Sequence, residues 1–199
     1  MITPRNYISY SQIALWERSP DEYARNYIYG EKQRVTRNMA LGSALADGLE
    51  RGEVTGDPIL DLVMSILPKF ELMDVAFEAY LKNGKETITL LAKPDTCKSD
   101  YSAFKEFKTS TRRWTQKMVD QSSQITFYTT AIWLKTGKIP KDIELICVKT
   151  SYDEHGELIP TDDIFHFRTH RSLTDIIKMT KRIRVAWAGI KALCEKELL

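Results

Sequence analysis

The sequence lacks most features that mark a specialised class of protein. Its only cysteines, Cys97, Cys147 and Cys194, lie far apart without a C-x-x-C pair, so neither a disulfide framework nor a zinc or iron–sulfur site is expected. No apolar run reaches the roughly 18 residues of a membrane span, and residues 1–30 lack the apolar core of a signal peptide. We therefore expect a cytoplasmic protein without a membrane contact. The formal net charge of +2 excludes a uniformly basic or acidic chain.

The composition is that of an ordinary globular protein. Of the 199 residues, 43% are hydrophobic and 28% charged, and neither an internal repeat nor a Gly/Ser-rich linker divides the chain. We therefore predict a single α/β domain over residues 1–199. Its first part, 1–70, is helical, and 71–199 forms a sheet core with a C-terminal helix.

Helix signals concentrate in the first part of the chain. Capping-box spacings join Ser9 to Gln12 and Ser19 to Glu22, and they predict two short consecutive helices. A third helix, which Gly52 ends, is indicated by a stripe of leucines four residues apart: Leu41, Leu45 and Leu49. A fourth short helix is expected over 58–67.

Strand signals begin at Met73. Apolar and polar residues alternate over 73–81, and Asn83-Gly84 predicts a hairpin to a second strand over 85–94. A third strand is expected over 103–109.

The remaining elements are two helices and two strands. A helix is expected to end at Gly137, and its apolar face is formed by Ile125, Tyr128, Ile132 and Trp133. Strands over 143–150 and 164–168 are expected to pair around a turn at 154–156. The spacing of Ser172 and Asp175 predicts the start of a last long helix, which extends to about residue 198.

Residues 90–110 hold a group of side chains suited to phosphodiester chemistry. Glu106 and Lys108 lie two apart on one strand and share a face, whereas Phe107 points to the other. If the strand that ends at Asp95 pairs with this one, the two carboxylates converge, and Mg²⁺ prefers such oxygen ligands. The Lys108 ammonium is placed to orient a water molecule. The alternative is a solvent-facing edge strand without catalytic function.

These residues resemble the signature of the PD-(D/E)XK nuclease superfamily, specifically its RecB-like branch, which contains many phage and CRISPR-associated exonucleases. The resemblance implies a restriction-endonuclease-like core, in which helices flank a mixed central sheet and N-terminal helices form one wall of the cleft. Its motifs occur in order along most of the chain: Ser9-Tyr10-Ser11-Gln12-Ile13, Ala40-Leu41-Gly42-Ser43 with Leu49-Glu50, Pro94-Asp95, Glu106-Phe107-Lys108, and Gln124-Ile125-Thr126-Phe127-Tyr128.

The resemblance also implies a set of site residues. The metal ligands for Mg²⁺ or Mn²⁺ are expected to be Glu50, Asp95, Glu106 and the carbonyl of Phe107. The family's histidine is replaced by Ala46, which leaves the number of metal ions open. The catalytic set is expected to be Asp95, Glu106, Lys108, Gln124 and Tyr128, in which Lys108 activates water and the last two line the cleft. Tyr128 has a core position as its alternative.

Basic side chains next to this segment are candidates for nucleic-acid binding. They are Arg112, Arg113 and Lys117, which surround Trp114, a residue able to stack on a base. The alternative is a solvated basic loop whose tryptophan lies in the core. A second basic group lies on the last helix (Arg171, Lys178, Lys181, Arg182, Arg184), whereas acidic residues gather on the late hairpin, which is expected to face away from DNA.

The sequence thus predicts a metal-dependent deoxyribonuclease. By resemblance, it is expected to be an exonuclease of phage-type DNA recombination or repair, in the cytoplasm of a bacterial or phage-infected cell. Its expected partners are DNA and a single-strand annealing or other recombination protein, and the oligomeric state is left open. The alternatives are an endonuclease on the same fold, for restriction or defence, and a catalytically silent module that binds nucleic acid or a protein.

Overall fold

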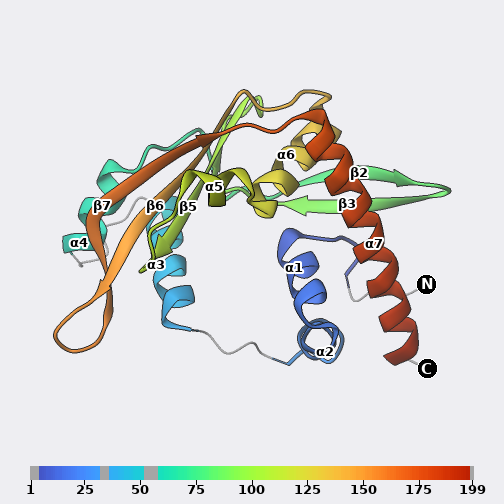
Figure 1. Ribbon diagram of the computed structural model, residues 1–199, viewed down its shortest axis with the longest axis horizontal. Coiled ribbons are helices and arrows are strands. Elements are labelled where there is room, and N and C mark those ends of the chain that lie inside the picture. Colours follow the sequence, from blue (N-terminus) through green and yellow to red (C-terminus); the bar gives the residue numbers. More distant parts are fainter. Residues whose placement is uncertain (1–4, 32–35, 52–57, 198–199) are drawn as a thin grey trace.

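A five-stranded mixed sheet forms the centre of the computed structural model, which describes residues 5–31, 36–51 and 58–197 (Figure 1). The strand order is β1-β4-β5-β6-β7, and every neighbouring pair is antiparallel except β5 and β6. The strands are β1 (Leu72–Met73), β4 (Thr96–Cys97), β5 (Ala103–Ser110), β6 (Asp142–Tyr152) and β7 (Leu158–Thr169). The predicted α/β class with a mixed central sheet is therefore confirmed.

The predicted hairpin forms a separate two-stranded sheet of β2 (Phe77–Asn83) and β3 (Glu86–Ala92). Gly84 is the first residue of its two-residue turn and has a φ of 63°, as glycine does in type II′ turns. The single strand expected over 73–81 is wrong, because Asp74 has a φ of 51° and interrupts it. Met73 belongs instead to β1 in the central sheet.

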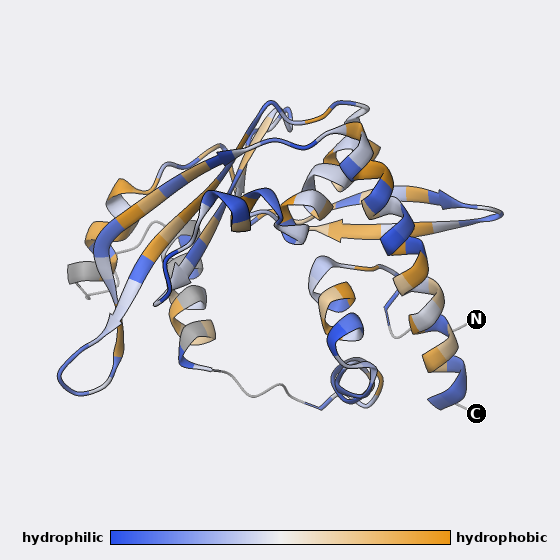
Figure 2. Ribbon diagram, viewed as in Figure 1, coloured by the Kyte–Doolittle hydropathy of each residue, from blue (hydrophilic) through white to orange (hydrophobic). Residues whose placement is uncertain are grey.

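Two helices and the hairpin cover one face of the sheet. They are α6 (Ser123–Thr136) and α7 (Leu173–Glu197), and their buried side chains pack with those of β5 and β6 in the main core. The predicted ends hold: Gly137 is left-handed after α6, and Ser172 exchanges hydrogen bonds with Asp175 at the start of α7. Figure 2 shows apolar residues along β3 and β6, where they face this core.

The N-terminal helices lie against α7 (Figure 1). Ser9 caps α1 (Tyr10–Arg18) and Ser19 caps α2 (Pro20–Tyr23), as predicted, and the chain continues as a π-helix, η1 (Ala24–Ile28). The indole of Trp16 lies directly over Gly189 of α7. Ile8, just before α1, exchanges backbone hydrogen bonds of 2.8 and 2.9 Å with Thr89 and Leu91 of β3.

Further helices lie on the other side of the sheet and beside it. A second core joins the sheet to α4 (Pro58–Ile66) through Phe107, as the strand pattern predicted for that side chain. The third predicted helix is α3 (Arg37–Arg51); Gly52 and the side chains of Leu45, Ala46, Leu49 and Glu50 fall outside the described residues. The short α5 (Gln116–Asp120) precedes α6. No helix in the described ranges has both the length and the apolarity needed to cross a bilayer.

Candidate active site

Asp95 lies beside Glu106 because of a short strand that the sequence analysis did not predict. Asp95 directly precedes β4, in which Thr96 pairs with Lys105 of β5. The Asp95 Oδ2 atom accepts a hydrogen bond of 2.6 Å from the backbone N–H of Phe107. The convergence of the two carboxylates thus occurs through β4, and not through pairing of the longer strand β3 with β5.

The Glu106 carboxylate is buried and held by two donors. Its Oε1 atom accepts hydrogen bonds of 2.6 Å from Lys108 Nζ and of 2.6 Å from Gln124 Nε2. Its Oε2 atom has no hydrogen-bond partner among the residues that the structure describes. A buried carboxylate oxygen without a partner carries a desolvation cost, so the arrangement favours a cation at this atom.

The pKa values of the site reflect burial and the closeness of the charges. Burial first, and then the negative charge of Glu106, raises the pKa of Asp95 to about 8. Burial acts to lower the pKa of Lys108, but the charge and hydrogen bond of Glu106 outweigh it and the net pKa is raised. Lys108 is therefore a cation at neutral pH, whereas Asp95 keeps its proton there until a further positive charge favours its ionised form.

Gln124 and Tyr128 lie one turn apart on α6 and face Glu106. Gln124 Nε2 donates to the Tyr128 hydroxyl at 3.0 Å as well as to Glu106. The Tyr128 ring is buried edge-on against Phe104, with 6.1 Å between the ring centroids. Tyr128 thus combines the two alternatives: its ring belongs to the core, and the residue lines the cavity at Asp95.

The donor set fits a hard divalent cation. The described residues supply two carboxylates, Asp95 and Glu106. The Phe107 carbonyl lies on β5, the strand that carries Glu106. No cluster of three or more acidic, histidine or cysteine side chains occurs in the described part of the chain. The third expected carboxylate, Glu50, is on α3, but its side chain is outside the described residues. Two carboxylates with remaining positions for water and substrate are typical of Mg²⁺.

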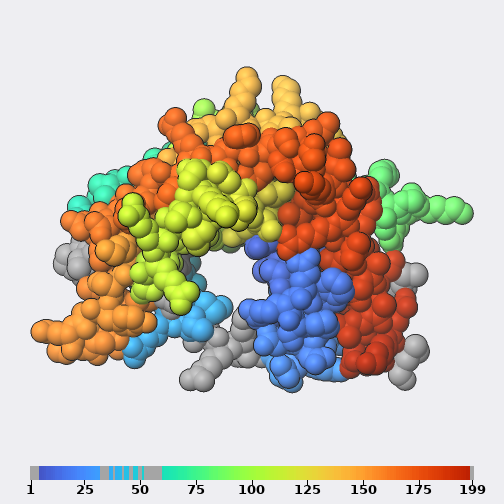
Figure 3. Space-filling view, viewed as in Figure 1, coloured from blue at the N-terminus to red at the C-terminus, as the bar shows by residue number. Residues whose placement is uncertain are grey.

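A cavity of about 450 Å³ opens at Asp95, and the N-terminal helices form one wall of it. Its lining includes Tyr7, Ser9, Tyr10 and Tyr27 on that wall and Gln124 and Tyr128 on the other side. Figure 3 shows the surface hollowed between the blue N-terminal helices and the yellow-green segment around β5 and α5.

Asp74 is a further residue of this cavity that the sequence reasoning missed. Its backbone N–H donates to the carbonyl oxygen of Asp95 at 2.9 Å, and its carboxylate pairs with Lys93. A left-handed aspartate is uncommon and strained. The only signal in the sequence was an acidic residue within an otherwise regular strand pattern.

The predicted nucleic-acid-binding residues lie along the yellow-green segment in Figure 3. Arg112 and Lys117 are exposed, and the Arg113 guanidinium lies 5.6 Å from the centre of the Phe165 ring. Trp114 is partly buried against the main core. The arrangement leaves three exposed cations, Arg112, Arg113 and Lys117, for a phosphate backbone, and the tryptophan is in part a core residue.

The basic side chains at and before α7 do not form one exposed surface. Arg171 is buried and donates five hydrogen bonds of 2.7 to 3.1 Å, which tie the ends of α5 and α6 to the segment after β7. Arg182 pairs with Glu17 of α1 through both carboxylate oxygens, and Arg184 donates to the Lys82 carbonyl at 3.0 Å. These arginines hold the fold together, and only the lysines of the group are exposed.

A buried ionic group occupies the opposite face of β5. Lys105 pairs with Glu144 of β6, whose other oxygen lies 2.9 Å from His166 Nδ1. Both the lysine and the glutamate are at most 8% exposed. The pKa of Glu144 is lowered, since the hydrogen bonds from Lys105 and His166 outweigh the burial that acts to raise it. His166 therefore has a structural role as a hydrogen-bond partner of Glu144.

Comparisons with known proteins locate the fold. No family model and no curated protein matches the sequence. Among solved structures, a candidate exonuclease from Eubacterium rectale matches with a TM-score of 0.59 and 12% identity over 96% of this chain and 82% of that one. LHK-Exo, an alkaline exonuclease from Laribacter hongkongensis, matches in its complex with dAMP with a TM-score of 0.53 and 15% identity, over 97% and 92% of the chains. The chain shares the fold of these proteins, whereas membership of the PD-(D/E)XK superfamily and of its RecB-like branch stays a prediction.

Proposed function

We propose that this protein is a metal-dependent deoxyribonuclease. The observation that carries the proposal is the Glu106 carboxylate: one oxygen is fixed by Lys108 and Gln124, and the other is buried without a partner beside Asp95. A merely structural glutamate is expected to have both oxygens satisfied or solvated. Two convergent carboxylates with an adjacent ammonium match the requirements of phosphodiester hydrolysis.

Each residue of the site has a distinct role in the proposal. Asp95, Glu106 and the Phe107 carbonyl, with Glu50 of α3, would hold Mg²⁺ or Mn²⁺, which would supply Lewis-acid stabilisation and a water of lowered pKa. Lys108 orients the attacking water and stabilises the negative charge that grows on the phosphate. Gln124 fixes the Glu106 carboxylate, and the Tyr128 hydroxyl in turn holds the Gln124 amide.

We further propose that the enzyme acts from DNA ends. Two solved structures with this fold are described as exonucleases, and one of them holds dAMP, a mononucleotide. A role in recombination or repair, beside an annealing protein, remains part of this proposal. The three cysteines are buried free thiols, which suits the reducing cytoplasm.

The test uses purified protein with linear and circular DNA, each single- and double-stranded, in Mg²⁺, Mn²⁺ or EDTA. We expect metal-dependent loss of linear DNA, and Lys108→Ala and Glu106→Gln should each reduce the rate at least about 100-fold while the fold is kept. Lys138→Ala, an exposed lysine after α6, is the matched control. Cleavage of circular DNA would identify an endonuclease. Binding of DNA without hydrolysis under all conditions would identify a catalytically silent module. Retained activity in either site variant would refute the assignment.

A further inference from the structure

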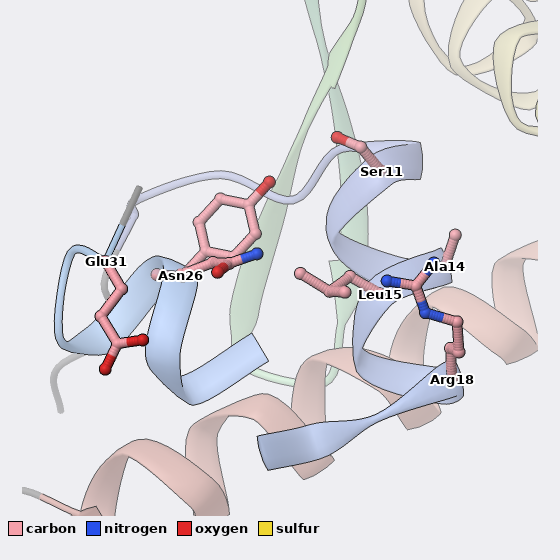
Figure 4. A pocket seen from close by; sticks show the side chains of 7 residues that line it. Ser11, Ala14, Leu15, Arg18, Asn26 and Glu31 are labelled. Atoms are coloured by element: carbon pink, nitrogen blue, oxygen red, sulfur yellow. The ribbon is translucent and has the colours of Figure 1, made fainter. Parts of the chain in front are cut away.

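A second cavity adjoins the candidate active site on the surface of the N-terminal helices. It has a volume of about 400 Å³ and lies between α1 and the end of η1. Figure 4 shows Ser11, Ala14, Leu15 and Arg18 on α1 and Asn26 and Glu31 across from them. The two cavities share Ser11 and Tyr27. A groove therefore extends from Asp95 over the helical wall, and Tyr27 lies where its two halves meet.

Tyr27 is supported from behind as a rigid aromatic surface. Its ring stacks on that of Tyr23, with centroids 4.8 Å apart and an angle of 27° between the planes. Tyr23 is fully buried, and its hydroxyl donates a hydrogen bond of 3.1 Å to the side chain of Gln12, itself buried. A ring held in this way loses little conformational entropy when a second flat group stacks on it.

We propose that Tyr27 stacks on an unpaired base and that the groove holds a single-stranded segment of the substrate next to the scissile phosphate. The inference rests on the proposed nuclease function and names its substrate class. A base inside a duplex has both faces covered by its neighbours, so a tyrosine can stack only on an unpaired base or on the terminal pair of a duplex. The groove continues past Tyr27 on both sides, which favours a single strand lying along it over a duplex end that stops at the ring. The rest of the lining of the second cavity mixes small, apolar, polar and charged side chains: Ser11, Ala14, Leu15, Arg18, Asn26 and Glu31. We expect recognition through stacking and backbone contacts to depend little on sequence.

Arg18 supplies a positive charge at the far end of this groove. It pairs with Glu22 at 2.6 Å, and the two side chains are 65% and 41% exposed. An exposed pair of this kind contributes little to stability, so Arg18 can exchange the carboxylate for a phosphate. The Ser11 hydroxyl and the Asn26 amide lie along the way as hydrogen-bond donors to the backbone of the strand.

The experiment measures binding without hydrolysis, in the Glu106→Gln protein and in EDTA. The probes are a fluorescein-labelled oligothymidine of about 16 nucleotides, the upper range of single-strand site sizes, and a blunt duplex of equal length. A third probe is the same single strand with one 2-aminopurine, whose fluorescence is quenched by stacking. We expect Tyr27→Leu to weaken single-strand binding about 5-fold or more and to remove the quenching, with duplex binding unchanged. Tyr27→Phe should keep both, and Tyr152→Leu, at a tyrosine 63% exposed, is the matched control.

Arg18→Ala provides a second and independent variant, because this exposed side chain is not needed for folding. We expect weaker single-strand binding and a salt dependence whose slope is smaller by about 1. Unchanged binding in Arg18→Ala, retained quenching in Tyr27→Leu, or equal losses for single strand and duplex would each overturn the proposal. Because no step requires hydrolysis, a failure here with an active wild-type enzyme refutes the groove alone. Single-strand binding by a wild-type protein inactive with every metal would refute only the nuclease.

Discussion

Gln124 on α6 donates a hydrogen bond of 2.6 Å to the Glu106 carboxylate on β5. The same amide nitrogen lies 3.0 Å from the Tyr128 hydroxyl. One helix thereby fixes the orientation of a carboxylate that belongs to a strand of the central sheet. Such supporting contacts determine how well a metal ligand is positioned.

We expect Gln124→Ala to lower the rate of DNA hydrolysis about 10- to 100-fold and to weaken the apparent Mg²⁺ affinity, because Glu106 loses one of its two donors. The measurement is the initial rate as a function of Mg²⁺ concentration. Gln121→Ala, at an exposed glutamine just before α6, serves as the control. A normal rate and Mg²⁺ dependence in Gln124→Ala would show that the contact is dispensable.

The raised pKa of Asp95 predicts a specific dependence of stability on pH. An aspartate in the unfolded chain has a pKa of about 3.9, whereas that of Asp95 in the fold is about 8. Between these values the folded protein binds the extra proton, so its free energy of unfolding in EDTA should fall as the pH rises from about 4 to about 8. Asp95→Asn lacks this titrating group, so its free energy of unfolding should not show this fall. The wild type should therefore lose stability relative to Asp95→Asn between about pH 4 and about pH 8.

Mg²⁺ should reverse this trend, because the cation competes with the proton for the same carboxylate. Urea unfolding at pH 6, 7, 8 and 9, in EDTA and in Mg²⁺, measures both effects. We expect the stabilisation by Mg²⁺ to be larger at pH 9 than at pH 6. An equal Mg²⁺ effect at all four values, or a pH-independent difference between wild type and Asp95→Asn, would contradict the assignment.

The Lys105 and Glu144 pair should affect stability without affecting catalysis, because Lys105 points away from the face that carries Glu106. Lys105→Met leaves the buried carboxylate of Glu144 without its main partner and should cost about 3–5 kcal/mol in the free energy of unfolding. The double variant Lys105→Met/Glu144→Leu should recover most of this loss. Urea unfolding and the DNA assay, run on the same preparations below the unfolding transition, distinguish stability from activity.

Gly189→Ala should destabilise the protein although alanine favours helices. A Cβ atom at Gly189 would lie 2.1 Å from the indole of Trp16, so α1 would have to move away from α7. The gain in helix propensity is about 1 kcal/mol, and overpacking costs about 1–3 kcal/mol, so we expect a net loss of up to about 2 kcal/mol. The control is the double variant Trp16→Leu/Gly189→Ala. If its loss in free energy of unfolding equals the sum of the two single losses, the contact with Trp16 does not cause the destabilisation by Gly189→Ala.

The elements that could be predicted from the sequence are those fixed by local interactions. Capping at Ser9, Ser19 and Ser172 and the left-handed Gly137 depend on neighbouring backbone groups alone, and each was found where the spacing placed it. The two-residue strands β1 and β4 have no periodicity to detect, and they exist because longer strands and Asp74 hold them in place. Burial of Lys105 was also beyond local pattern, since its partner is 39 residues away on the parallel strand β6.

The candidate site also has a part that local geometry predicts and a part that depends on tertiary packing. The shared face of Glu106 and Lys108 follows from strand geometry, and the one-turn spacing of Gln124 and Tyr128 from helix geometry. The contact between the two pairs depends on how α6 packs on the sheet, which the residue pattern alone did not determine. The sequence grouped Arg182 and Arg184 of α7 with the exposed lysines as one basic group. Their formal charge does not show that Glu17 and a backbone carbonyl already bind them.

The contacts between the N-terminal helices and α7 have a consequence for the order of folding. Trp16 packs on Gly189, Glu17 pairs with Arg182, and Tyr29 bonds Glu197, so one wall of the cleft is held by residues more than 160 positions later in the chain. Contacts of such long sequence separation form late, because the loop between them must close first. During synthesis the carboxylate strands and the contact of Ile8 with β3 can form before α7 is available, but the contacts of the wall with α7 cannot. The nascent chain should therefore complete this wall only after α7 has been synthesised.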